Sequence, residues 1–363
     1  MSLEGQFKFW IGASLVLAVL LWLLSPILLP FVVGFGIAYL MRPLVDGLER
    51  LRVNRLLAAL LVVALVVLAF VVVILAVVPT LAQQLTSFIQ MVPEYVGKLQ
   101  SVINDPTHPW IRRIVGLTGV EDAGSVADLV KQGTGWISTF LASLWSGGRS
   151  LISLFSLMVV APVVAFYLVY DWNRMTATMD GWVPVRQRET VRRLAREADA
   201  AVAGFVRGQS AVCLLLGLFY AAGLTLAGLN FGLLIGLVSG ILTFIPYVGS
   251  LTGLVLATAV AVAQFWPEWT PIVVVIGIFL VGQFIEGNIL APKLVGESIG
   301  VHPVWLIFAL LAFGYLFGFV GLLLGAPLAA TVGVLVRFAF ERYRASPLFT
   351  GETAPPSLPP GPR

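Results

Sequence analysis

The second half of the chain contains a long stretch that is almost free of charge. Between Arg207 and Arg337 lie 129 residues with four charged side chains, which are Glu268, Glu286, Lys293 and Glu297. A soluble domain carries roughly 25% charged residues, so water would not solvate a stretch of this kind. The segment has to lie in a lipid bilayer or against similar apolar protein. The whole 363-residue chain follows the same trend, with 59% apolar residues, 11% charged residues and a mean hydropathy of +0.98.

Basic residues fall in short clusters beside the apolar runs. One cluster contains Arg42, Arg50, Arg52 and Arg55, seven arginines lie between residues 174 and 207, and the last cluster contains Arg337, Arg342 and Arg344. Clusters of this kind are typical of the cytoplasmic loops of membrane proteins. The net charge of +4 therefore indicates a lipid bilayer as the partner and not a nucleic acid. The positions of the basic clusters along the chain also predict that both termini are cytoplasmic.

Apolar runs and the breaks between them predict an all-α polytopic membrane protein. We divide the chain into amino-terminal spans at 1–78, an extracytoplasmic helical insert at 79–149, a fourth span at 150–170, a basic amphipathic helix at 171–208, a transmembrane core at 209–344 and a disordered proline-rich tail at 345–363. The first group consists of a helical hairpin at 7–24 and 27–40 and a third span at 56–78. In the amphipathic helix, apolar residues from Val191 to Phe205 recur every three or four positions among arginines. We expect this helix to lie on the inner membrane face, the alternative being a solvated basic face.

An internal repeat relates residues 231–265 to residues 303–337. With an offset of 72 positions, seven of fourteen residues in 247–260 are identical to those in 319–332. Each copy of about 35 residues exceeds the roughly 20 residues of one span and is broken near its middle, at 245–249 or 318–321. Each copy is therefore a broken spanning helix or a re-entrant hairpin, and the position of Lys293 favours hairpins. Two hairpins entering from opposite faces would form an inverted repeat suited to alternating access.

Polar residues gather in one apolar span of the core and at the two breaks. A carboxylate in the bilayer is costly, so it is usually paired, neutral or used in ion coupling. Glu286 is thus the best candidate for a proton or cation site, and a structural ion pair with Lys293 is the alternative. The breaks expose helix ends and backbone groups that can contact a solute. The predicted solute or ion pathway consists of Gln283, Glu286, Asn288, Lys293, Pro246, Gly249, Gly321 and Gly325.

Motifs of enzymes and metal sites are missing from the sequence. The chain has no G-x-x-x-x-G-K-[ST] phosphate loop and no H-E-x-x-H pair. Two histidines and the single Cys213 are too few to form a metal cage by themselves. We therefore expect a protein that is not an enzyme and that uses no cofactor and no metal.

Several sequence strings together resemble the autoinducer-2 exporter family of bacterial membrane proteins, also described as PerM-type permeases. The strings are LPF at 29–31, AYL at 38–40 with Pro43, FVRGQ at 205–209, FIPYVG at 244–249, IEG at 285–287, PKLVG at 292–296, HP at 302–303 and the segment 318–327. The resemblance implies about eight transmembrane segments, a place in the bacterial cytoplasmic (inner) membrane, cytoplasmic termini and a homo-oligomer. It marks as family-motif positions Arg207, Gly208, Gln209, Pro292, Gly296 and Pro303.

Three functions follow as alternatives from these observations. The first is a secondary transporter or permease that exports a small polar metabolite such as autoinducer-2, with Glu286 coupling transport to protons. The second is a sodium (lithium)/proton antiporter, for which one membrane carboxylate offers few ligands. The third is a structural membrane protein or scaffold that binds a partner through the insert at 79–149.

Overall fold

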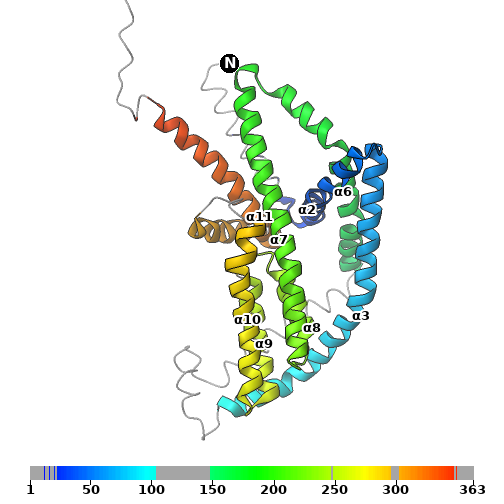
Figure 1. Ribbon diagram of the computed structural model, residues 1–363, viewed down its shortest axis with the longest axis vertical. Coiled ribbons are helices and arrows are strands. Elements are labelled where there is room, and N and C mark those ends of the chain that lie inside the picture. Colours follow the sequence, from blue (N-terminus) through cyan, green and yellow to red (C-terminus); the bar gives the residue numbers. More distant parts are fainter. Residues whose placement is uncertain are drawn as a thin grey trace, which may run out of the picture.

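The computed structural model describes residues 23–103, 148–246, 248–295 and 302–346, together with the single residues 12, 16, 20 and 349. Within these ranges every regular element is a helix (Figure 1). The elements are α2 (Ser25–Arg50), α3 (Arg55–Ile103), α6 (Gly148–Trp182), η1 (Val185–Gln187), α7 (Arg188–Leu226), α8 (Gly232–Leu242), α9 (Val248–Phe265), α10 (Trp269–Ile285), η2 (Glu286–Val295) and α11 (Pro303–Arg344). Most of the predicted first span, most of the insert, Gly296 and nearly all of the tail lie outside the described residues.

Six helical stretches among the described residues are long and apolar enough to cross a membrane. They are Ile27–Arg50, Arg55–Tyr95, Val185–Leu226, Val248–Phe265, Trp269–Val295 and Val304–Arg344. Large apolar side chains remain exposed along them, for example Leu65 at 58% and Leu75 at 70%. A surface of this kind has to be covered by lipid or by other apolar protein. The predicted all-α polytopic membrane fold is confirmed.

The helices α2, α3 and α6 form one layer of the molecule. Their shared core is built mainly from small and β-branched residues, namely Ala38, Met41, Val45, Ala58, Ala59, Val62, Ala165 and Val169. At Gly34, a Cβ atom would overlap Ala161 and Val164 of α6, so the backbones of α2 and α6 approach closely. Small residues allow this approach in lipid, where the hydrophobic effect between helices is weak.

The helix α3 continues for 49 residues, past the expected end of the third span at residue 78. It contains Pro79 and Pro93 and bends beneath α8 and α9 (Figure 1). A proline removes one helical hydrogen bond and commonly produces such a bend without ending a membrane helix. The bend brings Leu81, Leu85 and Phe88 onto the core of the second layer, as their helical spacing predicts.

The second layer is built around α7, which is a single helix of 39 residues. Residues 188–208 of the predicted amphipathic helix and the start of the predicted transmembrane core therefore form one element of about 58 Å, at 1.5 Å per residue. The expectation that the basic segment lies flat on the inner membrane face is wrong, because an unbroken helix cannot both cross a bilayer and lie in its plane. The helices α8 and α10 pack along α7 (Figure 1).

Both copies of the internal repeat are helical hairpins. In the first, α9 folds back on α8, so a Cβ atom at Gly249 would overlap Thr243 and one at Gly253 would overlap Ser239. In the second, α11 reverses at Gly318, whose φ of 60° and ψ of −138° are not helical. There a Cβ atom at Gly321 would overlap the Phe313 carbonyl. Each copy thus folds back on itself as a helical hairpin, and entry of the two hairpins from opposite faces of the membrane stays a prediction.

The two hairpins lie against opposite ends of α7. The open end of the first is fastened at the carboxy end of α7, where the Gln264 amide donates to the Gly228 carbonyl at 2.8 Å. The carboxy-terminal arm of the second runs to the amino end of α7, where Arg193 and Glu341 approach to 3.8 Å. This placement is the one that an inverted repeat requires.

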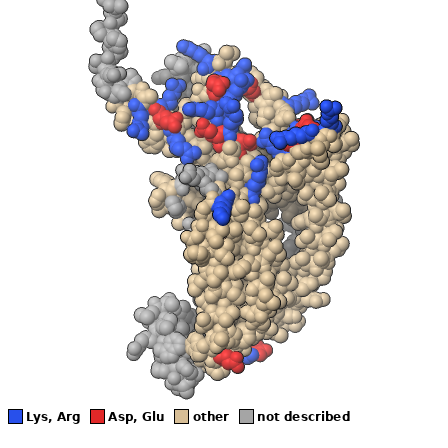
Figure 2. Space-filling view, in the orientation of Figure 1, with Lys and Arg blue, Asp and Glu red and all other residues tan. Residues whose placement is uncertain are grey.

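The charged side chains gather at one end of the molecule. Figure 2 shows Lys and Arg side chains crowded there, above a broad uncharged belt, with few charges at the opposite end. Contacts join the basic clusters at this end, since Arg42 donates to Asp199 at 3.2 Å and Arg193 lies 3.8 Å from Glu341. The clusters that are predicted to share one side of the membrane therefore lie at one end of the molecule, and we refer to this part of the molecule as the basic end.

Candidate functional site

A cavity of about 970 Å³ lies at the basic end, between the two layers. Helices α2 and α6 supply one side and α7 and α11 the other. Its aromatic and polar lining residues are Phe35, Tyr39, Arg42, Trp172, Asn173, Thr176, Asp180, Arg192, Arg196, Asp199 and Thr331. Much of the remaining lining is apolar, including Leu324 and Leu328 of the second hairpin. A concave, mostly apolar space with a few polar groups at an interface between structural units is the usual form of a small-molecule site.

Tyr39, Arg42, Trp172 and Asp199 form a connected group on the wall of this cavity. The Tyr39 hydroxyl donates to the Asp199 carboxylate at 2.8 Å, and Arg42 donates to its other oxygen at 3.2 Å. The Arg42 guanidinium also lies 4.7 Å from the centre of the Trp172 ring. Because Tyr39 and Arg42 are three residues apart on α2, they share one helix face.

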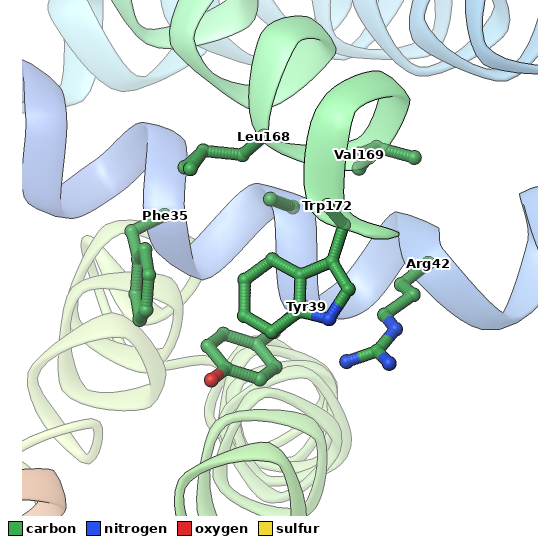
Figure 3. A pocket seen from close by; sticks show the side chains of 7 residues that line it. Phe35, Tyr39, Arg42, Leu168, Val169 and Trp172 are labelled. Atoms are coloured by element: carbon green, nitrogen blue, oxygen red, sulfur yellow. The ribbon is translucent and has the colours of Figure 1, made fainter. Parts of the chain in front are cut away.

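A small recess continues from this group between α2 and α6. Figure 3 shows Phe35, Tyr39 and Arg42 of α2 beside Leu168, Val169 and Trp172 of α6. The Tyr39 ring lies edge-on both to Phe35, at 4.9 Å, and to Trp172, at 5.9 Å between ring centres. Edge-on aromatic contacts stabilise a fixed arrangement of rings. The three aromatic side chains therefore form an ordered part of the cavity wall.

The carboxylates of the cavity are neutralised by arginines. Asp199 is paired with Arg42, and Asp180 accepts two hydrogen bonds of 2.6 Å from Arg192. The hydrogen bonds from Arg192 lower the pKa of the Asp180 carboxyl below its usual range. Among the described residues, no group of three or more His, Cys, Asp or Glu could hold a metal ion. A bare cation would therefore have to displace an arginine, whereas an uncharged polar solute would not.

The apolar face of the basic segment of α7 is turned toward this cavity. Val191, Ala198 and Val202 line it, and Phe205 is fully buried one turn further on. The predicted amphipathic spacing is thus confirmed, but its apolar side faces a protein cavity and not the membrane surface. Spacing alone cannot distinguish these two environments, because both are less polar than water.

Glu286 lies at the end of the buried stripe of α10. Ile272, Val275, Phe279 and Gly282 are buried at spacings of three and four residues, and Glu286 is the next position of this series. It therefore faces α7, the helix that carries Cys213 and Tyr220. The Gln283 amide donates to Glu286 Oε2 at 3.4 Å. Lys293 is not within ion-pair distance of Glu286 in the described part of the chain, so the structural ion-pair alternative is wrong.

The motif residues Arg207, Gly208 and Gln209 contact three different elements. The Arg207 Nε donates to the Tyr39 carbonyl of α2 at 3.2 Å. A Cβ atom at Gly208 would overlap the backbone of Leu294 in η2. The buried Gln209 amide donates to the Thr243 carbonyl at the tip of the first hairpin, at 2.6 Å. Successive helical residues point about 100° apart, so one short string joins the first layer, η2 and the hairpin tip.

The remaining predicted site residues are spread over these elements. Pro246 is half-buried at the first hairpin tip, and Gly249, Gly321 and Gly325 are buried inside the two hairpins. Gln283, Asn288, Pro292 and Lys293 are exposed on α10 and η2. Pro303 begins α11, where His302 Nδ1 accepts a hydrogen bond from the Val304 amide at 3.3 Å. None of the eight predicted pathway residues lines the cavity described above.

The sequence prediction missed the group formed by Tyr39, Arg42, Trp172 and Asp199. The contact between Tyr39 and Asp199 joins residues 160 positions apart, which no local spacing reveals. Asp199 nevertheless lies on the apolar face of a helical segment in which arginines outnumber acids, next to Ala198. A carboxylate on such a face is a signal that could have found it. Tyr39 lies within one of the strings that carry the family resemblance.

Fold and cavity together define a polytopic α-helical membrane protein with a solute-sized space between two helical layers. The family described as AI-2E family transporter matches residues 11–341. The chain therefore belongs to the AI-2E transporter family, and the predicted resemblance is confirmed.

Three relatives are 26–31% identical to the chain over the aligned residues. "Putative transport protein YrrI" of Bacillus subtilis (strain 168) is 31% identical over 326 residues, covering 87% of each chain. "Putative permease PerM" of Escherichia coli (strain K12) is 26% identical over 322 residues, covering 87% of this chain and 88% of its own. "AI-2 transport protein TqsA" of the same strain is 26% identical over 322 residues, covering 88% and 86%. The similarity thus extends over nearly the whole length of these proteins.

Proposed function

We propose that this chain is a secondary transporter that exports a small polar metabolite, such as autoinducer-2, across the bacterial cytoplasmic membrane. The observation that supports it is the cavity of about 970 Å³, where Tyr39, Trp172 and Asp199 meet an apolar wall from the second hairpin. Pairing of both cavity carboxylates with arginines favours a polar solute over a bare cation. The relative TqsA is named as an AI-2 transport protein, so autoinducer-2 is the first solute to test.

In this proposal the basic end faces the cytoplasm, as the positive-inside rule requires. The cavity then opens toward the cytoplasm, and the first hairpin reaches into the protein from the other side. Gln209, through its hydrogen bond to Thr243, links the tip of that hairpin to α7. Alternating access would move the hairpins relative to α7, and backbone groups around Pro246 and Gly321 would contact the solute on its way. Cytoplasmic termini and a homo-oligomer are further predictions of the same proposal.

Glu286 couples export to proton movement in this proposal. It is half-buried, faces α7 and has no arginine or lysine partner among the described residues. A carboxylate in such a place can change its charge during transport, whereas one neutralised by an arginine cannot do so readily. Glu286→Gln should therefore abolish the response of flux to an imposed proton gradient. Unchanged pH-dependent transport in this variant would remove the coupling role.

The experiment that tests the function is autoinducer-2 flux in proteoliposomes that contain the purified full-length protein. Proton and sodium gradients are imposed in parallel arms. The cavity is blocked by Ala195→Trp, because Ala195 lines it, and the matched control is Ala200→Trp, because Ala200 is exposed on α7 and does not line it. We expect flux above that of empty liposomes, its loss in Ala195→Trp and its retention in Ala200→Trp. Sodium-driven proton movement without autoinducer-2 flux would instead favour the antiporter, and flux that survives Ala195→Trp would exclude the cavity from the path.

A further inference from the structure

Tyr220 is a completely buried tyrosine whose hydroxyl has no partner. Its side chain is 0% exposed in α7, and its ring stacks on Phe279 of α10 with 4.5 Å between the ring centres and 21° between the planes. Within the described residues the hydroxyl makes no hydrogen bond. Burying a hydroxyl without a partner loses its hydration and gains nothing in return, so such groups are rare and call for an explanation. For packing alone, phenylalanine would fill the same place without this cost.

The neighbouring helix makes room for this hydroxyl. A Cβ atom at Gly282 of α10 would overlap both the ring and the hydroxyl oxygen of Tyr220. Gly282 is thus required by the tyrosine, and a helix interior ordinarily disfavours glycine. Two unfavourable choices, an unpartnered hydroxyl and a helical glycine, therefore coincide at one point of the α7–α10 interface.

Glu286 lies one helical turn beyond Gly282 on the same face of α10. Side chains of a helix tilt toward its amino end, so the Glu286 carboxylate extends back toward the level of Gly282 and Tyr220. The one hydrogen bond of this carboxylate in the described residues is the 3.4 Å contact from Gln283. The other titratable group that faces it from α7 is Cys213, and Lys293 on its own segment does not pair with it.

A change of helix type at this position offers a way to bring the two groups together. Glu286 is the first residue of η2, a π-helical segment of ten residues. Such segments are uncommon and occur frequently at functional sites. Rewinding the first turn of η2 into an α-helix would rotate Glu286 about the helix axis while Tyr220, stacked and buried, stays in place.

We propose that the Tyr220 hydroxyl is the hydrogen-bond donor that positions the ionised Glu286 carboxylate in a second conformation of the transporter. Tyr220 is then a positioning residue, and its hydroxyl is free in the conformation described here. When Glu286 takes up a proton, its carboxyl no longer requires this donor and the contact opens. The part of this inference that concerns coupling rests on the proposed function of Glu286.

Infrared difference spectroscopy of the reconstituted full-length protein tests the contact without relying on transport. The carbonyl stretch of protonated carboxyl groups is followed as the pH changes, and the Glu286 band is the one that Glu286→Gln removes. Because Tyr220 donates to the ionised form, Tyr220→Phe should move the titration midpoint of this band upward by about one pH unit. Tyr315→Phe is the matched control, since Tyr315 is 91% exposed on the second hairpin, and it should leave the midpoint unchanged.

Several results would overturn the inference. A midpoint that stays in place or moves downward in Tyr220→Phe contradicts it, as does an equal shift in Tyr315→Phe or a Glu286→Gln spectrum that loses no band. A double variant of Tyr220 and Glu286 should show the pH response of flux of Glu286→Gln alone, because the two residues act as one unit. Wild-type protein without flux would contradict the proposed function, while the infrared result would still decide the contact between Tyr220 and Glu286.

Discussion

Gly282 lies where α10 passes the phenol ring of Tyr220. We expect Gly282→Ala to destabilise the protein by about 1–3 kcal/mol, because the added methyl group overlaps a ring that Phe279 holds in place. Gly277→Ala on the same helix is the control, since a Cβ atom there meets nothing within 4 Å. It should stabilise the protein by about 0.5–1 kcal/mol through the higher helix propensity of alanine. Thermal unfolding in detergent measures both, and equal midpoints for the two variants would contradict the close contact.

Individual residues differ in how far the sequence could reveal their roles. Glu286 is identifiable because a lone acid in an apolar run is costly, and the structure adds that it faces α7. Tyr220 gives no such signal, since a tyrosine in an apolar run ordinarily belongs to the packing. Its significance depends on a missing hydrogen bond, which is a property of the folded contacts. Asp199 lies among arginines in the sequence, so it is read as part of an ordinary charged segment. Its role depends on the hydrogen bond that it accepts from Tyr39, 160 positions away.

The reversal of α11 at Gly318 is a property of one element and can be tested there. A Cβ atom at Gly318 would meet nothing within 4 Å, so space does not require glycine at this position. The backbone conformation requires glycine instead, because a residue with a side chain is strained at φ of 60° and ψ of −138°. We expect Gly318→Ala to destabilise the second hairpin by about 1–3 kcal/mol. Gly36→Ala in α2, where space is also open, is the control.

Hydrogen exchange followed by mass spectrometry locates the effect of Gly318→Ala. Exchange should rise in peptides from α11 and remain unchanged in peptides from α2 and α8, because local strain weakens the element that contains it. A uniform rise across the chain, or no change in α11, would show that the reversal at Gly318 does not depend on glycine.

Helical elements could be predicted where the sequence carries a periodic signal and less well where it does not. The positions of the two hairpin tips, near Pro246 and Gly318, could be predicted from the breaks in the internal repeat. Each copy is longer than one span, so its helix has to be interrupted within the copy. The continuation of α3 from residue 78 to Ile103 was not evident. Pro79 and falling hydropathy are typical of a helix end, whereas the contacts of Leu81, Leu85 and Phe88 with the second layer stabilise the helix beyond it.

At the scale of the whole molecule, the cavity arises from the way two layers meet. Its walls come from α2, α6, α7 and α11, so no single segment of sequence contains it. The charge pattern, by contrast, could be predicted, since each basic cluster follows an apolar run and all such clusters must share one side of a membrane. The sequence does not reveal that the cavity lies at this same end of the molecule. Because the cavity opens there, the orientation of the molecule in the membrane decides which compartment supplies the solute.

Orientation in the membrane can be measured with single cysteines. The natural Cys213 is the only cysteine of the sequence and is first replaced by serine. Thr176→Cys then reports on the cavity, which Thr176 lines, and Glu268→Cys reports on the opposite end of the molecule, where Glu268 is exposed. We expect a membrane-impermeant maleimide to label Thr176→Cys in inside-out vesicles and Glu268→Cys in right-side-out vesicles, because the basic end should face the cytoplasm. The reverse pattern would place the cavity outside, and a transporter that loads its solute there would import it and not export it.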